Sequence, residues 1–248
     1  MPTRPLARLL VCTLLALVLA GAAYAQSIIE PEVEKGQPKL EAFGVFQSGL
    51  NGGAAGDLRE LHSLSYHHSL TDFWMIKAIL GLERPVNGDH RAAVAVLENV
   101  FEIQNAKKAG GIGYGWFTGI SVGIDDEATN AVAFGPIVRL GAGATSLILN
   151  PFFEQTFGRN RDEGIAFLYG WQLKHQVRQG FTVGVEGFGR FQDITGQGGT
   201  EEHRAGPLLA FELPLEGKQA LSFETGWLFG FNDTTPDHTI KFQVTYAY

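Results

Sequence analysis

The sequence predicts an all-β protein: a single closed antiparallel up-and-down transmembrane β-barrel of about 12 strands, preceded by an N-terminal signal peptide. Three observations support this prediction. Apolar and polar residues alternate with a period of two along most of the chain after residue 37. The segments between the alternating stretches switch between tight turns and longer loops rich in Gly, Asn and Asp. The chain also ends inside an alternating stretch, TIKFQVTYAY (239–248).

Residues 1–25 have the pattern of a secretory signal peptide. Arg4 and Arg8 precede the apolar run LLVCTLLALVLAGAA, and Ala23-Tyr24-Ala25 forms an A-x-A cleavage site. The run is too short to cross a bilayer as a helix. We therefore expect cleavage between Ala25 and Gln26, followed by a periplasmic N-terminal segment (26–37) and a barrel (38–248).

The composition of the remaining chain excludes several classes of function. The only cysteine, Cys12, lies in the signal peptide, so disulfides and thiolate chemistry are excluded after cleavage. Arg4 and Arg8 are two of the 19 basic residues, and none of the 26 acidic residues is removed, which leaves a net charge of −9. An acidic chain of this kind argues against nucleic-acid binding. We expect no cofactor.

Twelve strands follow from the period of two. The stretch RAAVAVLENVFEIQ has a composition that favours a helix, but its alternation favours a strand. Pro136 and Pro207 each follow a glycine inside a predicted strand, and we expect a β-bulge at both Gly-Pro pairs. The predicted strands are 38–48, 58–68, 73–84, 91–104, 111–123, 131–140, 145–156, 164–176, 181–193, 203–213, 219–231 and 238–248.

The connections predict a barrel with two unlike rims. SLTD (69–72) and GAGAT (141–145) are tight turns, whereas GLNGGAAGD (49–57) and TGQGGTEEH (195–203) are long loops. With an even number of strands, both termini fall on the short-turn rim. Outer-membrane barrels have this arrangement, with their short turns in the periplasm.

The distribution of side chains indicates which face of the sheet points outward. Strand 219–231 carries Phe223, Trp227 and Phe229 on one face and Glu224 on the other. So many aromatic side chains would overfill a barrel interior, so the aromatic faces should contact the lipid bilayer and lipopolysaccharide. We therefore predict that the lumen contains these charged residues: Glu98, Glu102, Arg139, Lys174, Glu186, Arg190, Arg204, Glu212, Glu224 and Lys241.

The last strand has a predicted role in assembly. A closed barrel must pair its last strand with its first, which explains why the chain stops inside the sheet. Its alternating residues Phe242, Val244, Tyr246 and Tyr248 resemble the C-terminal signal that the outer-membrane assembly machinery recognises in bacterial barrels.

Three further stretches carry a family resemblance: EPEVEKG after the signal peptide, HRAGPLLAFELPL (203–215) and WLFGFNDTTPDHTIKF (227–242). They resemble uncharacterised, porin-like small outer-membrane proteins of proteobacteria. The resemblance implies a β-barrel in the outer membrane of a Gram-negative bacterium, reached by export through the periplasm. It implies no reaction.

Histidines near the predicted long-loop rim are candidate metal ligands. His62, His90, His203 and His238 lie there with Glu201 and Glu202 nearby. No fixed ligand spacing links them, and unpaired loop histidines are common. We expect no metal site.

The stretch HHS is a candidate catalytic element. His67 and Ser69 share one face of a strand, and Glu83 follows on the next strand. Lipid-modifying hydrolases with a barrel fold use such a His-x-Ser pair together with a carboxylate. The predicted topology places the pair at the periplasmic end, which favours a polar strand end without catalysis, and we expect no enzyme.

The favoured function is a narrow porin-like channel for small solutes. Twelve strands lie between barrels filled by their own side chains and barrels that enclose an aqueous channel. Mixed charges in the lumen fit either a narrow pore or a structural barrel with a plugged lumen. A lipid-modifying hydrolase is the second alternative, and a soluble lipocalin-like binder with its aromatic residues inside is the third.

Overall fold

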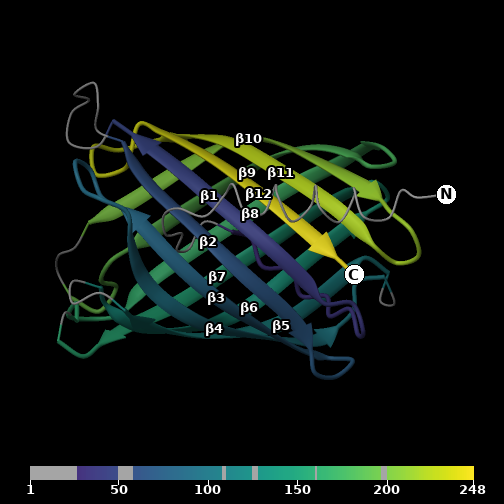
Figure 1. Ribbon diagram of the computed structural model, residues 1–248, viewed down its shortest axis with the longest axis horizontal. Helices are drawn as coiled ribbons and strands as arrows, with labels where there is room; N and C mark the ends of the chain where they lie inside the picture. Colours follow the sequence, from purple (N-terminus) through teal and green to yellow (C-terminus); the bar gives the residue numbers. More distant parts are fainter. Residues whose placement is uncertain (1–26, 50–57, 108–109, 125–127, 160, 197–199) are drawn as a thin grey trace, which may run out of the picture.

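Twelve antiparallel strands close into one barrel in the computed structural model (Figure 1), which describes residues 27–49, 58–107, 110–124, 128–159, 161–196 and 200–248. The predicted cleavage site between Ala25 and Gln26 lies outside the described residues. The strands are β1 (Lys39–Ser48), β2 (Arg59–Ser69), β3 (Trp74–Arg84), β4 (Arg91–Gln104), β5 (Ile112–Gly123), β6 (Asn130–Ala142), β7 (Thr145–Phe157), β8 (Ala166–Arg178), β9 (Phe181–Phe191), β10 (Glu201–Pro214), β11 (Ala220–Gly230) and β12 (His238–Ala247).

The barrel closes where the sequence predicts. β1 pairs with β12 along its whole length, from Lys39 opposite Ala247 to Ser48 opposite His238. Beyond the last strand, the Tyr248 amide donates a hydrogen bond of 3.1 Å to the Pro38 carbonyl oxygen. The C-terminus lies at the right-hand rim in Figure 1, where the short turns also lie, and the longer loops lie at the left.

The twelve predicted strands are confirmed, with bounds that differ by at most two residues from those expected. Residues 91–104, whose composition favours a helix, form β4, because pairing with β3 and β5 outweighs intrinsic propensity. No helix among the described residues is long and apolar enough to cross a bilayer.

The expected bulges at the Gly-Pro pairs are wrong. β10 keeps one register with β11 on both sides of Pro207, from Arg204 opposite Gly230 to Leu208 opposite Gly226. Two residue pairs of the β10–β11 ladder are missing between these points, but neither strand contains an extra residue there. Proline lacks the N–H that the ladder needs, and the preceding glycine lets the neighbouring backbone approach closely.

Pro136 behaves in the same way in β6. The pairing with β7 is interrupted around Pro136, yet Phe134 opposite Phe153 and Val138 opposite Leu149 belong to one register. The register shifts of the described strands lie elsewhere, between Gly81 and Leu82, between Glu102 and Gln104, and between Gln176 and Arg178.

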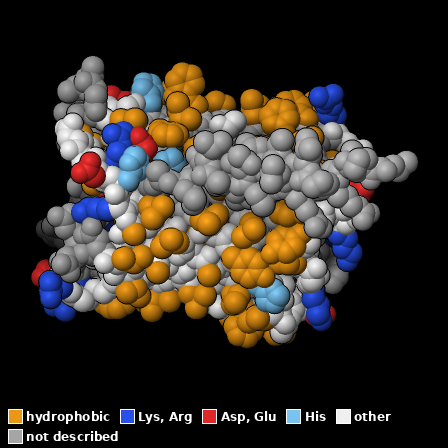
Figure 2. All heavy atoms as spheres, viewed as in Figure 1, with side chains coloured by type: hydrophobic (Ala, Val, Ile, Leu, Met, Phe, Trp, Pro, Cys, Tyr) orange, Lys and Arg blue, Asp and Glu red, His pale blue; other side chains and the backbone are white. Residues whose placement is uncertain are grey.

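The outer surface carries an apolar band between two charged ends. Figure 2 shows hydrophobic side chains spread over the side of the barrel, with Lys, Arg, Asp and Glu gathered at its ends. Aromatic and aliphatic side chains of many strands point outward in this band. Examples are Leu80, Leu97, Trp116, Ile120, Phe134, Leu173, Val185, Phe211, Trp227 and Ile240, each more than one third exposed.

The middle of the lumen also contains apolar side chains, which the sequence did not predict. Phe117 and Phe152 stack with ring centroids 4.5 Å apart, and both point inward. Phe43, Phe188 and Leu228 are buried in the interior from other strands. These residues, which we call the apolar waist, narrow the lumen between its two polar halves.

Gly206 provides a test of close packing between β10 and β11. A β-carbon at this position would lie 1.9 Å from the Trp227 carbonyl oxygen, so Gly206→Ala must push the strands apart. We expect a loss of about 1–3 kcal/mol in the free energy of unfolding. The measurement is the temperature at which the folded, faster-migrating band disappears in a heat-modifiability gel.

Gly141→Ala is the matched control for Gly206→Ala. A β-carbon there would meet its nearest neighbour, the Gly111 carbonyl oxygen, at 3.4 Å, which is an ordinary contact. Equal transition temperatures for the two variants would contradict close strand packing at Gly206.

Candidate functional site

The charged lumen is the candidate site. Each charged residue predicted to face inward lies on the inner face of its strand. Glu98, Lys174, Glu212 and Glu224 line the large cavity described below, and Glu102 and Arg139 contact the N-terminal segment. The other residues of the predicted set, Glu186, Arg190, Arg204 and Lys241, pair with acidic or basic groups inside the barrel.

One network joins β8, β9, β11 and β12. The Lys241 ammonium lies 2.7 Å from a Glu186 carboxylate oxygen and 3.4 Å from Glu224, and Lys241 and Glu186 are fully buried. Lys174 lies 2.8 Å from Glu224. The Gln172 amide donates to both carboxylates, at 3.0 Å to Glu186 and 2.9 Å to Glu224. The charges alternate in sign, so this wall is neutralised by its own residues.

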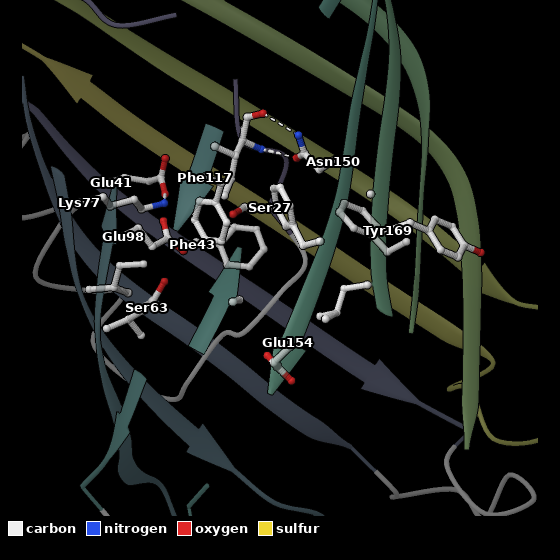
Figure 3. A pocket seen from close by; sticks show the side chains of 18 of the residues that line it. Ser27, Glu41, Phe43, Ser63, Lys77, Glu98, Phe117, Asn150, Glu154 and Tyr169 are labelled. Carbon is white, nitrogen blue, oxygen red and sulfur yellow. Dashed lines mark hydrogen bonds and ion pairs between the residues drawn. The ribbon is translucent and has the colours of Figure 1, made fainter. Parts of the chain in front are cut away.

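A second network joins β1, β3 and β12 and was only partly predicted. The Lys77 ammonium lies 2.8 Å from a carboxylate oxygen of Glu41, and the Gln243 amide donates to the other oxygen at 2.8 Å. Figure 3 shows Glu41, Lys77 and Glu98 together at one side of a cavity. Glu41 and Lys77 were not among the predicted lumen residues, although each alternates with apolar neighbours and therefore shares the inward parity.

The half of the lumen near the long loops has its own ion pairs. The Arg190 guanidinium lies 2.7 Å from Glu154, and Arg59 lies 3.4 Å from Glu83. Arg204 pairs with Glu202 and is almost fully buried. These pairs, like those of the two networks, join residues of the barrel wall.

Residues 27–37, which we call the N-terminal segment, lie inside the barrel at its short-turn end. The sequence predicts a periplasmic position for residues 26–37. In the structure, Ile28, Ile29 and Val33 pack against an inward-facing cluster, which places the segment against the wall of the lumen. The cluster consists of Val100, Phe117, Ile137 and Ile148 from β4, β5, β6 and β7.

Polar groups of the wall hold the backbone of the segment. The Asn150 side chain accepts a hydrogen bond from the Ile29 amide at 2.8 Å and donates one to the Ile29 carbonyl oxygen at 2.9 Å (Figure 3). The Glu102 carboxylate accepts a hydrogen bond from the Val33 amide at 2.7 Å. These hydrogen bonds give partners to backbone groups of the segment that would otherwise be buried and unpaired.

Two wall glycines make room for the segment. A β-carbon on Gly115 would lie 2.6 Å from the Phe101 carbonyl oxygen of the next strand and 3.3 Å from the β-carbon of Pro31, which is fully buried. A β-carbon on Gly170 would lie 2.9 Å from Cδ1 of Ile28. The inner wall is therefore shaped to accept the side chains of this segment.

Ion pairs complete the attachment. The Arg139 guanidinium lies 2.9 Å from Glu30 and 3.4 Å from Glu32, and the Lys39 ammonium lies 2.8 Å from Glu34. Burial raises the pKa of Glu32, although Arg139 opposes the shift. Burial acts in the same direction on Glu34, but the hydrogen bond and charge of Lys39 outweigh it and hold the pKa of Glu34 below its ordinary value.

The lumen contains two cavities beside the segment. The larger, of about 690 Å³, is lined by the segment, by both charged networks and by residues of the short-turn rim, including Gly180 and Ala220. The smaller, of about 100 Å³, lies at the apolar waist between Phe43, Phe117 and Phe188. The short-turn half of the barrel is therefore hollow, and the middle is almost filled.

The candidate catalytic residues do not converge. Ser69 donates a hydrogen bond to the Glu34 carbonyl oxygen, whereas Glu83 lies at the other end of β3, beside Arg59. A different serine, Ser65, lies 3.1 Å from Nε2 of His67. The nearest carboxylate, that of Glu41, approaches the same nitrogen at 3.8 Å, whereas a catalytic triad needs the carboxylate on the opposite ring nitrogen.

The histidines near the long-loop rim are dispersed. His62 and His90 both approach Glu60, whereas His203 contacts Tyr169 and His238 contacts Trp227. Glu201 lies 3.5 Å from His203, and Glu202 pairs with Arg204. Among the described residues, no group of three or more His, Cys, Asp or Glu side chains is arranged to hold a metal ion.

Comparisons with known proteins identify the type of barrel. No protein-family model matches the chain, and no curated protein sequence matches it. Three solved structures share the fold at 8–10% identity: the KdgM porin in complex with disordered oligogalacturonate (TM-score 0.52), the NanC porin (0.55) and an outer-membrane channel from Pseudomonas putida F1 (0.59). The matches cover 85%, 84% and 89% of this chain and 98%, 98% and 100% of theirs, respectively. The fold is that of outer-membrane barrel porins.

The buried pair of Lys241 and Glu186 allows a test of the first network. Lys241→Met leaves the Glu186 carboxylate buried without its main partner, so we expect a loss of about 3–5 kcal/mol in the free energy of unfolding. The double variant Lys241→Met with Glu186→Gln removes both charges and should lose less than the sum of the two single variants. The measurement is urea unfolding of the lipid-folded barrel, followed by tryptophan fluorescence.

Lys35→Met is the control, because Lys35 forms an exposed pair with Asp72. It should change the free energy of unfolding by roughly 0–1 kcal/mol. Additive losses for Lys241 and Glu186 would show that the two groups do not stabilise each other.

Proposed function

We propose that the protein is a narrow outer-membrane channel for small solutes. The observation that carries this proposal is the cavity of about 690 Å³ inside a closed barrel, lined by charged and polar side chains and reaching the short-turn rim. An apolar outer band and a polar hollow interior are what a membrane channel requires. The fold shared with outer-membrane porins supports the proposal.

Two features keep the channel narrow. The apolar waist belongs to the wall, whereas the N-terminal segment enters the lumen from outside the sheet and occupies part of the short-turn half. The segment is held by hydrogen bonds, ion pairs and apolar contacts and has no place in the strand ladder. A structural barrel with a plugged lumen remains the second candidate function, because the same segment also serves as a plug.

We further propose that the barrel resides in the outer membrane of a Gram-negative bacterium after export through the periplasm. Lipid and lipopolysaccharide would cover the apolar band, and the outer-membrane assembly machinery would recognise the last strand. In support, Tyr246 and Tyr248 stack with ring centroids 5.4 Å apart at the short-turn rim, and Tyr248 is 41% exposed. Amphipathic rings are favoured at a membrane interface.

Removal of residues 28–35 tests the channel. The deletion keeps the cleavage site and β1 but takes away the side chains that occupy the lumen. We expect small conductance from the wild type and a several-fold larger single-channel conductance from the deletion variant in planar bilayers. Asn150→Ala, which removes both hydrogen bonds to Ile29, should give an intermediate conductance with more frequent transitions between levels.

The control is Thr145→Ala, which changes a strand-end residue that hydrogen-bonds His175 away from the segment. It should conduct like the wild type. A deletion barrel that folds but passes no current at any voltage would contradict the channel and leave the plugged structural barrel.

Tyr246→Ser with Tyr248→Ser tests the assembly proposal. Loss of both rings should reduce the folded protein in outer-membrane fractions by roughly tenfold and increase periplasmic degradation products. The double variant Tyr114→Ser with Trp116→Ser also removes two exposed aromatic rings, both from β5, but leaves the last strand and its neighbours intact. Equal folded yields for the two double variants would exclude a specific role for the C-terminal residues.

A further inference from the structure

Arg139 and Lys39 differ from Lys77, Arg190 and Lys241 in where their ion-pair partners come from. Lys77, Arg190 and Lys241 each pair with a carboxylate of the barrel wall, at distances of 2.7–2.8 Å. In the part of the chain that the structure describes, the ion-pair partners of Arg139 are Glu30 and Glu32, both from the N-terminal segment. The wall therefore presents a guanidinium whose counter-charge is supplied by a separate piece of chain.

The segment presents its acidic groups in a regular pattern. Glu30, Glu32 and Glu34 alternate with Pro31 and Val33, and the chain bends at Pro31. Their partners are Arg139, Lys174 at 4.0 Å from Glu30, and Lys39. These three cations lie on three different strands, β1, β6 and β8, around the short-turn half of the lumen.

The wall also recognises the segment as a peptide. Asn150 pairs with both the amide and the carbonyl group of Ile29, and Glu102 accepts the amide of Val33. The spaces at Gly170 and Gly115 hold the side chains of Ile28 and Pro31. Backbone pairing, the space at two glycines and three cations together describe a binding groove for an acidic peptide.

We propose that this groove is a binding site for short acidic peptides, and that the N-terminal segment occupies it as an internal pseudo-ligand. The inference rests on the proposed channel function, because it assigns the class of solute that would enter the short-turn half of the lumen. A peptide that displaces the segment replaces one carboxylate at Arg139 by another, so the guanidinium is never left buried alone. The Glu102 carboxylate needs a hydrogen-bond donor at the place that the Val33 amide now occupies. A peptide amide supplies this donor, and a simple anion does not.

The exchange is sterically accessible from the large cavity. Glu30, Glu32, Glu34, Lys39 and Lys174 all line it, so an incoming chain reaches Lys39, Lys174 and the segment's glutamates without opening the sheet. The side chains of Glu30 and Glu34 are 46% and 50% exposed, which keeps their ion pairs weak enough to exchange. The better-buried contacts, at Asn150 and Glu102, are hydrogen bonds that any extended peptide can form.

The test uses the folded barrel without residues 28–35, in detergent, and the free peptide SIIEPEVEK, which corresponds to residues 27–35. Fluorescence anisotropy of the labelled peptide measures binding and needs no conduction. We expect SIIEPEVEK to bind roughly tenfold more tightly than SIIQPQVQK, in which the three glutamates are glutamines. Arg139→Gln in the same barrel should weaken the binding of SIIEPEVEK by a similar factor and leave the binding of SIIQPQVQK unchanged.

Arg190→Gln is the matched control, because Arg190 is also a lumen arginine but pairs with the wall residue Glu154. It should leave the affinity of both peptides unchanged. Wild-type barrel should bind SIIEPEVEK much more weakly than the deletion barrel, because the tethered segment competes for the groove. If the deletion barrel does not fold, the full-length variant Glu30→Gln, Glu32→Gln, Glu34→Gln keeps the backbone contacts and should bind SIIEPEVEK more tightly than the wild type does.

Three results would overturn the proposal: equal affinity for the two peptides, no effect of Arg139→Gln, or equally strong competition by a short polyacrylate, which carries carboxylates without amide groups. The same barrels in planar bilayers separate this proposal from the channel itself. Current without peptide binding would refute the peptide site and leave the channel standing. Peptide binding without current would establish the site and refute the channel.

Discussion

Closure of the hydrogen-bonded sheet is the constraint on which the rest of this structure depends. Hydrocarbon offers no partner to a backbone N–H or C=O group, so β1 and β12 must pair along their full length. An antiparallel meander of twelve strands then brings both ends of the sheet to the same rim. The last strand ends at Ala247, and the Tyr248 amide still donates a hydrogen bond to the Pro38 carbonyl oxygen. The distribution of side chains is the reverse of that in a soluble protein, with Trp116 and Trp227 outside and Lys241 inside.

A barrel with apolar side chains outside and charged side chains inside must neutralise those charges in a confined space. The wall does this with pairs that join different strands: β1 to β3 through Glu41 and Lys77, and β9 to β12 through Glu186 and Lys241. Such pairs also fix the register, because a slip of one residue would turn each charged side chain toward lipid. The lumen is thereby divided into a hollow polar half, an apolar waist and a half that contains Arg190, Arg204 and their carboxylates. The N-terminal segment fits the hollow half because the wall there lacks side chains at Gly115 and Gly170.

The sequence was sufficient for the strands and for the two faces of the sheet, because a period of two is a local pattern. It was insufficient wherever the outcome depends on which residues meet across strands. Residues 91–104 could be assigned from their alternation despite a helical composition, but the partners of Glu186 depend on a register that one strand does not contain.

Pro207 was expected in a bulge, and a missing ladder pair gives the same local signal as an inserted residue. Phe43 and Phe117 point inward because the space at the centre of twelve strands must be filled, which no single strand specifies. The segment carries no periodicity that distinguishes periplasm from lumen.

Tethering explains how weak contacts can hold the N-terminal segment in the lumen. The segment is continuous with β1, which begins at Lys39, so its residues are confined near the groove at an effective concentration on the order of millimolar. At such a concentration, partly exposed ion pairs at Glu30 and Glu34 and three backbone hydrogen bonds are enough to keep the groove filled. A free ligand can displace the segment only if its own concentration exceeds this value or if it binds the groove more tightly. The tether therefore sets a threshold, and a barrel of this design admits a competing solute only when that solute is abundant or matches the groove better than the protein's own chain.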